Sequence, residues 1–235
     1  MKLAIVNNSG NVGKSTICQV LLQPRLTDSQ IIKVETINSD GTDDLKFSAG
    51  EFHSIIQETD LYDHAILDVG SSNIETFIHQ MKEFKGSHDD IDYFIIPITP
   101  KHKQQIDSVS TVTTLGTLGV EPEKIRFIFN QADKIIPTDR QYSFFIKSIK
   151  EELDLIVNHA NTPTIYETSA FSLLSQQGRT FSEVTNDNRD FKAMLRESTD
   201  RDERLEISEL RTTKQLINGV NDILDAAFLN LNLGS

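Results

Sequence analysis

The stretch at residues 7–16 reads NNSGNVGKST and follows directly on an apolar run at residues 3–6. Its GKS tripeptide, residues 13–15, fits the end of the phosphate-loop spacing G-x-x-x-x-G-K-[ST], but Asn8 stands where that spacing has its first glycine. An amphipathic helix is expected from residues 14–23. Because strand, glycine-containing loop and helix follow in this order, the stretch predicts a nucleotide-binding loop. The alternative, a glycine-rich turn, would not require a lysine at the start of the helix.

The residue types of this loop suit phosphate. Gly10 and Gly13 let the backbone approach an anion, and successive N–H groups at a helix N-terminus form an anion-binding nest. Lys14 is expected to reach the β- and γ-phosphates, and the Ser15 hydroxyl to ligate Mg²⁺. Thr16 is expected near the α-phosphate. The predicted nucleotide-binding residues of the loop are Ser9, Gly10, Asn11, Val12, Gly13, Lys14, Ser15 and Thr16.

Short apolar runs alternate with longer amphipathic stretches along the chain. The strand candidates are residues 3–6, 31–34, 65–67, 93–96, 125–129 and, more weakly, 164–166. The helix candidates are residues 14–23, 73–84, 104–118, 140–158 and 205–230. This alternation predicts right-handed βαβ units and an α/β fold of the P-loop NTPase type. We expect a doubly wound, mainly parallel sheet with helices on both faces.

The chain has 235 residues, enough for one substantial core, and we expect a single P-loop ATPase-like domain over residues 1–235. Residues 176–204 are polar and are interpreted as an ordered excursion or a mobile loop, followed by a C-terminal helix over residues 205–230.

Two further carboxyl-bearing segments follow strand candidates. Asp68 ends the third strand, where it could hold Mg²⁺ through a water, or could simply cap the next helix. Glu35, Asn38 and Asp40 follow the second strand and could orient the attacking water or complete the Mg²⁺ shell. The sequence does not choose among these three, and each could be an ordinary polar loop residue. The candidate catalytic residues are Lys14, Asp68, Glu35 and Asp40.

An asparagine lies at the end of the fifth strand candidate. Asn130 carries both a donor and an acceptor on its amide, so that it could read the edge of an adenine base. The alternative is a turn formed by Asn130 and Asp133.

The composition bears on partners and location. The formal net charge is −12, with 35 acidic and 23 basic residues, and such a surface repels phosphate backbones. Cations between residues 189 and 214 are interspersed with carboxylates, so we expect weak or no direct nonspecific DNA binding. No apolar run is long enough to span a membrane, the first residues do not resemble a signal peptide, and Cys18 is the single cysteine. These features indicate a cytoplasmic protein.

Taken together, the motifs resemble those of the ParA/MinD family of deviant Walker ATPases. The family's loop KGGVGKT corresponds to SGNVGKS at residues 9–15, its strand-three aspartate to Asp68, and its strand-five asparagine to Asn130. The segment IPITP at residues 96–100 is also similar, and the resemblance covers roughly residues 1–135. Within the family, residues 9–15, PRL at 24–26 and VETIN at 34–38 look like the plasmid-stability StbB or conjugation-associated TraL branch.

The resemblance implies binding of ATP or ADP with Mg²⁺ and weak hydrolysis of ATP to ADP and phosphate. It implies a nucleotide-dependent switch in plasmid stability, partition or conjugative transfer, working with a protein partner, a plasmid-encoded DNA-binding protein. A nucleotide-dependent homodimer is a further implication.

Two positions depart from the family pattern. Ser9 replaces the signature lysine that reaches the phosphate of a partner subunit, and the acidic D-x-D pattern aligns with residues 35–37, of which the last is Ile37. These departures leave hydrolysis and dimerisation open. They motivate an alternative, a nucleotide-binding scaffold without turnover. A third alternative is a small-molecule phosphoryl-transfer or ligase enzyme, for which the sequence shows no acceptor-binding residues.

Overall fold

The computed structural model describes residues 1–36 and 45–234. Their strands form a seven-stranded sheet in the order β3-β2-β4-β1-β5-β6-β7, and each neighbouring pair is parallel. The strands are β1 Lys2–Ile5, β2 Ser29–Val34, β3 Lys46–Phe47, β4 His64–Val69, β5 Tyr93–Ile98, β6 Ile125–Ala132 and β7 Thr164–Tyr166.

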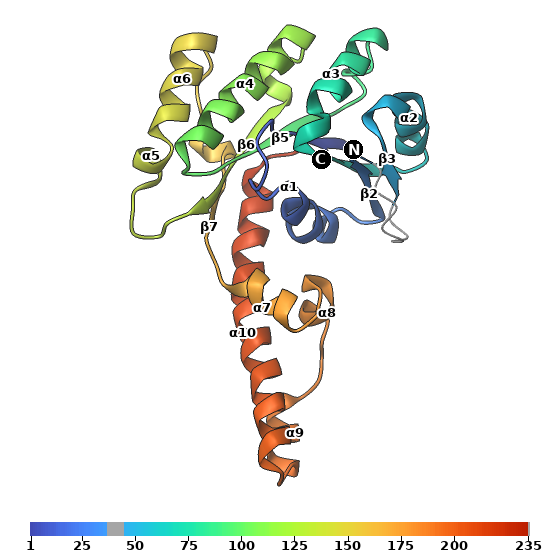
Figure 1. Ribbon diagram of the computed structural model, residues 1–235. Helices are drawn as coiled ribbons and strands as arrows, with labels where there is room; N and C mark the ends of the chain where they lie inside the picture. Colours follow the sequence, from blue (N-terminus) through green and yellow to red (C-terminus); the bar gives the residue numbers. More distant parts are fainter. Residues whose placement is uncertain (37–44, 235) are drawn as a thin grey trace. The chain divides into compact units, whose positions relative to one another are not determined.

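Helices connect successive strands. Figure 1 shows α2, α3, α4 and α6 on one side of the sheet and α1 on the other, so that the sheet is doubly wound as predicted. The α-helices are α1 Lys14–Thr16, α2 Phe52–Asp60, α3 Ile74–Glu83, α4 His102–Leu118, α5 Thr138–Gln141, α6 Ser143–Leu153, α7 Ala170–Gln176, α8 Phe181–Thr185, α9 Phe191–Glu197 and α10 Arg201–Asn230. A π-helix, η1 Ile17–Leu22, continues α1, and the 3-10 helices are η2 Gln23–Arg25, η3 Ala49–Glu51, η4 Ser71–Asn73, η5 Pro122–Lys124 and η6 His159–Asn161.

The chain divides into two compact units. The first contains residues 1–167 and 227–235, and therefore the whole sheet; the second contains residues 168–226. In the first unit the chain end returns to the sheet, where Arg126 Nε donates to the Leu231 carbonyl at 2.9 Å. The single domain over residues 1–235 stays a prediction.

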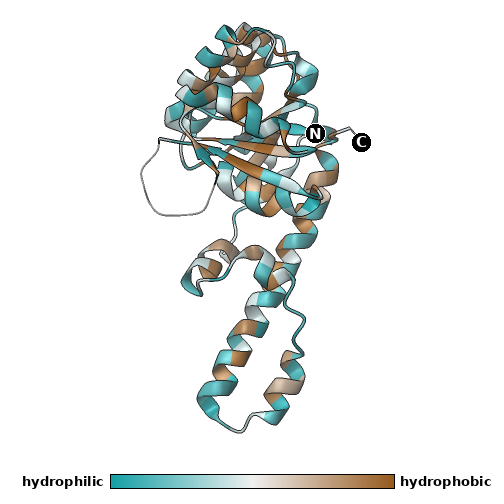
Figure 2. Ribbon diagram, turned by 90° about the vertical axis from the view of Figure 1, so that its right-hand side faces the viewer, coloured by the Kyte–Doolittle hydropathy of each residue, from teal (hydrophilic) through white to brown (hydrophobic). Residues whose placement is uncertain are grey.

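The core of the first unit explains why these apolar runs are strands. Successive side chains of a strand point to opposite faces, and both faces of a parallel sheet are buried. Alternate strand residues, such as Val34 and Val69, join one core with Phe52 of α2 and Phe77 of α3. The two rings meet edge to face at 5.4 Å, and burying each contributes about 1.5–3 kcal/mol. Figure 2 shows the hydrophobic colouring concentrated along the strands.

The structure differs from the predicted elements at several places. The helix expected over residues 14–23 is α only as far as Thr16 and then widens into the π-helix η1. The helix expected over residues 140–158 ends at Leu153, because Asp154 adopts a left-handed backbone with φ 53°. The sequence analysis also missed β3 and α2, although Ser48 and Glu51 form a capping box just before α2.

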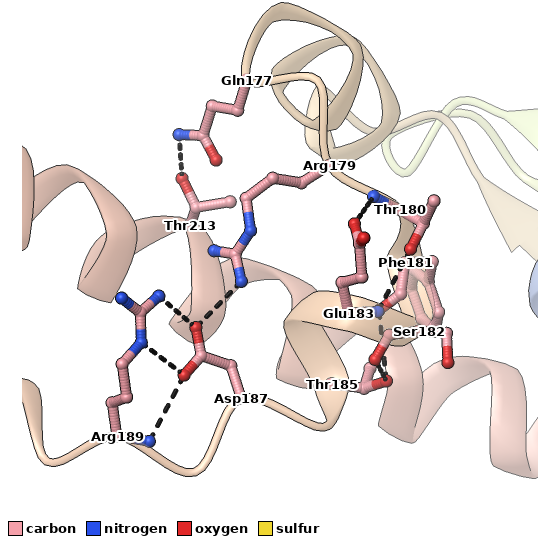
Figure 3. Close-up of polar contacts among 10 residues, drawn as sticks. All are labelled: Gln177, Arg179, Thr180, Phe181, Ser182, Glu183, Thr185, Asp187, Arg189 and Thr213. Carbon is pink, nitrogen blue, oxygen red and sulfur yellow. Dashed lines mark hydrogen bonds and ion pairs between the residues drawn. The ribbon is translucent and has the colours of Figure 1, made fainter.

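The second unit holds a buried carboxylate between two guanidinium groups (Figure 3). The Asp187 side chain is 6% exposed, and its Oδ2 lies 2.8 Å from Arg179 Nη2 and 2.6 Å from Arg189 Nη2. These hydrogen bonds hold the pKa of Asp187 well below its usual range. They join the segment after α7 to the segment before α9, while Gln177 Nε2 donates to Thr213 Oγ1 of α10 at 2.9 Å.

Replacing Asp187 by asparagine is expected to lower the stability of this unit by about 2 kcal/mol, because it removes charge-assisted hydrogen bonds from a buried group. The hydrogen bonds from the Arg189 side chain contribute most to the lowered pKa of Asp187, and the bond from Arg179 adds to them. A depressed carboxyl pKa stabilises the fold above the unfolded value, here 3.8, and this stability is lost as pH falls below it. Denaturation followed by circular dichroism at pH 7 and pH 3 checks both effects. Glu197→Gln, an exposed change on α9, is the control; equal stability of the two variants would contradict the assignment.

Candidate nucleotide-binding site

The predicted loop lies at the point where the sheet reverses its winding. β1 is flanked by β4 on one side and β5 on the other, with β2 beyond β4 and β6 beyond β5. Ligands of open parallel sheets bind outside the carboxyl ends of the strands at such a point. The loop between β1 and α1 therefore occupies the expected position for a ligand site.

The loop backbone explains which glycine is required. Gly13 has φ 87°, and a Cβ added to it would lie 2.5 Å from Asn130 Nδ2. Asn11 also has a positive φ, 57°. A Cβ at Gly10, by contrast, would meet Ser71 Oγ at an ordinary 3.5 Å. The loop therefore needs glycine at position 13, and its described fold does not require one at position 8, where Asn8 stands.

The side chain of Asn7, just after β1, and that of Asn130, on β6, fix the loop. Asn7 Nδ2 donates to the Pro97 carbonyl at 2.8 Å, and Asn7 Oδ1 accepts from the Ser9 N–H at 2.8 Å. Asn130 Nδ2 donates to the Val12 carbonyl at 2.8 Å. The loop is thus held at both of its ends by buried amides.

Helix α4 supports the same loop from the side. Gln104 Nε2 donates to the Gly10 carbonyl at 3.0 Å, and Asn7 Nδ2 also reaches Ser108 Oγ at 2.8 Å. Thr111 Oγ1 accepts from the Asn8 N–H at 3.0 Å. These bonds pre-organise the loop, which lowers the ordering cost of binding a ligand.

Lys14 is buried within the loop. Lys14 is 8% exposed, and its Nζ donates to the carbonyl of Asn7 at 3.0 Å and to that of Ser9 at 2.9 Å. Burial lowers the pKa of Lys14 to about 8, partly opposed by the charge of Asp68. The ammonium group is therefore mostly charged at neutral pH and is positioned to interact with a phosphate.

Ser15 and Asp68, the two residues that the sequence suggests as metal ligands, lie together in the structure. Asp68 is 2% exposed and accepts a hydrogen bond from the Ser15 side chain. Burial raises the pKa of Asp68, and the charge of Glu35 raises it further. Its Oδ2 is buried without a hydrogen-bond partner among the described residues. Such an oxygen beside a hydroxyl fits Mg²⁺, which binds one or two protein oxygens together with phosphates and waters.

Other features of the site limit what it can hold. Within residues 1–36 and 45–234, no group of three or more His, Cys, Asp or Glu side chains is arranged to hold a metal ion. Mg²⁺ would therefore need oxygen ligands from a nucleotide in addition to Ser15 and Asp68.

Replacing Asp68 by asparagine is expected to abolish the effect of Mg²⁺ on ATP affinity while leaving the nucleotide-free fold at least as stable. The change removes a buried carboxylate oxygen that lacks a partner, whose desolvation costs free energy. Calorimetric titration with ATP in Mg²⁺ and in EDTA measures the first effect, and thermal unfolding the second. The exposed change Asp60→Asn on α2 serves as control. A Mg²⁺ effect that survives in Asp68→Asn would exclude Asp68 as the metal ligand.

The remaining predicted residues are placed as follows. Glu35 is half-buried directly after β2, and its charge acts on Asp68. Thr16 ends α1 and is half-buried. Asn38 and Asp40 lie outside the described residues. Asn130 lies at the loop, where its amide donates to Val12, and the reading of an adenine edge stays a prediction.

Sequence reasoning missed two residues that build the site. Asn7 and Gln104 are buried and hydrogen-bonded to the loop, yet neither belongs to the phosphate-loop spacing. A signal was available for Gln104, since it belongs to a set of polar residues on the buried side of α4, which also includes Gln105, Ser108 and Thr111.

Comparisons with known proteins agree with the fold described above. No protein-family model matches the sequence, and no curated protein matches it significantly. Among solved structures, 45 chains match. The pNOB8 ParA structure has 11% identity and a TM-score of 0.51, covering 97% of this chain and 98% of that one. The MinC:MinD cell division protein complex of Aquifex aeolicus has 11% identity and a TM-score of 0.51, covering 93% and 96%. The cell division ATPase MinD of Pyrococcus furiosus has 14% identity and a TM-score of 0.50, covering 91% and 98%.

At these identities the likeness concerns the fold. The chain has the P-loop NTPase fold of the MinD and ParA type, as the sequence predicted. The narrower resemblance to the StbB or TraL branch is not shown by these matches. None of the helices described is both long and apolar enough to cross a membrane.

Proposed function

We propose that the chain binds ATP and ADP with Mg²⁺ at residues 9–16 and acts as a slow ATPase of the ParA/MinD type. The observation that carries the proposal is the pre-built loop in which Lys14 lies beside Ser15 and Asp68. The ParA and MinD neighbours support it through their fold and through the name ATPase that one of them carries.

Each residue has a role in the proposed reaction. The loop N–H groups and Lys14 hold the phosphates, Ser15 and Asp68 hold Mg²⁺, and the metal neutralises phosphate charge when bound. Glu35 orients a water for attack on the γ-phosphorus. The new oxygen–phosphorus bond forms as the bond to the ADP oxygen breaks, which yields ADP and phosphate. Asn38 and Asp40 are retained as alternatives to Glu35.

The nucleotide state is proposed to control binding of a protein partner. The segment after β4 is tied to the end of β2, because the Gly70 N–H donates to the Val34 carbonyl at 2.9 Å, and α3 follows within four residues. A terminal phosphate near Asp68 would therefore change the preferred conformation of the segments after β2 and β4 together. One structural neighbour, MinD, is itself seen in complex with a protein, MinC.

The proposed setting is cytoplasmic plasmid stability, partition or conjugative transfer, with a plasmid-encoded DNA-binding protein as the partner. The net charge of −12 supports association with DNA through the partner protein and not by direct contact. Fluorescence anisotropy with nonspecific duplex DNA at physiological salt is expected to show no binding by the chain alone, with or without ATP. Tight binding under these conditions would contradict the proposal that the chain reaches DNA only through its partner.

Phosphate release and sedimentation test the proposed activity. Slow release that disappears in Asp68→Ala supports an ATPase, whereas nucleotide binding without release favours the scaffold alternative, which Ser9 and Ile37 motivate.

Sedimentation of apo, ADP-bound and AMPPNP-bound protein tests the homodimer. ADP formation only after a small metabolite is added would favour the phosphoryl-transfer alternative.

A further inference from the structure

Two lysines on neighbouring strands of the sheet lie in register with Asp68. The strand register pairs Ile5 of β1 with Asp68 of β4, Asp68 with Lys33 of β2, and Lys33 with Lys46 of β3. Neighbouring strands are about 4.8 Å apart, and paired residues project from the same face of the sheet. Lys33 is therefore the direct cross-strand neighbour of the candidate metal ligand, and Lys46 is next in line.

The face on which these lysines lie is the face of the phosphate loop. The adjacent residues Val34 and Val69 belong to the core beneath α2 and α3. Since side chains alternate along a strand, Lys33 and Asp68 project to the opposite face, where α1 and η1 lie. The charge of Lys33 acts on Asp68 and also on Cys18 of η1, which agrees with this placement.

A pair of cations at this place is unusual for the chain. Like charges directly opposite each other on neighbouring strands are destabilising, and this chain has many more carboxylates than cations. Both lysines are half-buried near the carboxyl ends of their strands, the edge at which the loop lies. An anion bound beside Asp68 would lie within the field of both lysines, in addition to the partners that they already have.

The loop itself lacks one positive charge. Ser9 stands where the family loop KGGVGKT, which this segment resembles, has its first lysine. Ser9 is buried, its N–H donates to Asn7 and its carbonyl accepts from Lys14. A neutral hydroxyl cannot supply the charge that stabilises a terminal phosphate.

We propose that Lys33, supported by Lys46, binds the terminal phosphate of the nucleotide and supplies within the same chain the positive charge that position 9 lacks. The inference rests on the proposed nucleotide site and adds two binding residues to it. It requires no partner subunit to complete the charge around the γ-phosphate.

Both lysines already have interaction partners in the structure, so a purely structural role must be separated from phosphate binding. The ratio of affinities for AMPPNP and ADP separates them, because only AMPPNP carries a terminal γ-phosphate group. A structural role would change both affinities alike.

The test is calorimetric titration of the full chain with AMPPNP and with ADP, both in Mg²⁺. Lys33→Met is expected to weaken AMPPNP binding by about 10- to 100-fold, the range of one charge-assisted hydrogen bond, and ADP binding by less than about twofold. Lys33→Arg is expected to restore most of the AMPPNP affinity, and Lys46→Met to cause a smaller loss of the same kind. Lys82→Met, an exposed change on α3, is the matched control.

The outcomes separate this inference from the function on which it rests. If the wild-type chain binds neither nucleotide, the proposed function fails, and the inference fails with it. If the wild type binds both and Lys33→Met leaves the AMPPNP-to-ADP ratio unchanged, the inference alone is wrong. Should Lys33→Met unfold, as circular dichroism would show, Lys33→Gln and Lys46→Met carry the same ratio test.

Discussion

Replacing Lys14 by methionine is expected to lower the affinity for both ATP and ADP by about 100-fold or more. The ammonium group is held inside the loop by two carbonyls and is free to exchange them for phosphate oxygens. Each charge-assisted hydrogen bond contributes about 1.5–3 kcal/mol, and two of them account for a factor of this size. Calorimetric titration at pH 7 measures the loss.

The same residue gives the binding a pH dependence of known sign. With a pKa lowered to about 8, Lys14 of the free protein loses its proton as pH rises from 7 to 9. Binding of a polyanion favours the protonated form, so the wild-type affinity is expected to fall by about tenfold at pH 9. Lys14→Met should lack this dependence, and the exposed change Lys103→Met should retain it. A Lys14→Met variant with wild-type affinity would exclude the loop as the binding site.

Replacing Gly13 by alanine is expected to have the second-largest effect. Its φ of 87° is unfavourable for a residue with a side chain, and the new Cβ would lie 2.5 Å from Asn130 Nδ2. The left-handed backbone costs about 1–2 kcal/mol, and displacing Asn130 removes its bond to Val12. Stability should fall by about 2–3 kcal/mol, and nucleotide affinity should fall with it.

Thermal unfolding and ATP titration of Gly13→Ala check this prediction. Gly10→Ala is the matched control for stability, because its Cβ would meet Ser71 Oγ at 3.5 Å. Adding Asn130→Ala to Gly13→Ala should recover part of the lost stability by removing the clash. If Gly13→Ala melts like the wild type, the loop conformation described here is wrong.

The fold was predictable because its strands are apolar on both faces. Runs such as those of β1, β5 and β6 stand out from polar surroundings, and their alternation with helices leaves few topologies. α2 escaped detection because it is short and only three of its nine residues are buried. The π-helix η1 has the same apolar residues as an α-helix would, so the sequence does not distinguish them.

The site was predictable where chemistry follows a fixed spacing. Lys14 and Ser15 stand in the phosphate-loop spacing, and Asp68 ends a strand that the parallel sheet brings to the same edge. Gln104 lies 94 residues from its partner Gly10, and only the packing of α4 brings them together. Lys33 likewise looks like an ordinary strand residue until the register pairs it with Asp68.

The second unit shows the limit of reasoning from composition. Residues 176–204 are polar and are interpreted from the sequence as an ordered excursion or a mobile loop, and within them the Asp187 side chain is nearly buried between Arg179 and Arg189. A one-dimensional charge pattern does not reveal which carboxylate is enclosed by which cations. The buried carboxylate therefore emerged only with the packing.

The most direct test of the central claim is calorimetric titration of the wild-type chain with ATP in the presence of Mg²⁺. The structure predicts saturable binding of one ATP per chain, with a dissociation constant within about 1 μM to 1 mM, as for typical enzyme substrates. The same titration with excess ADP present should show competition. Absence of saturable binding at millimolar ATP would contradict the account, because the hydrogen bonds that hold the loop place Lys14 where a phosphate would bind.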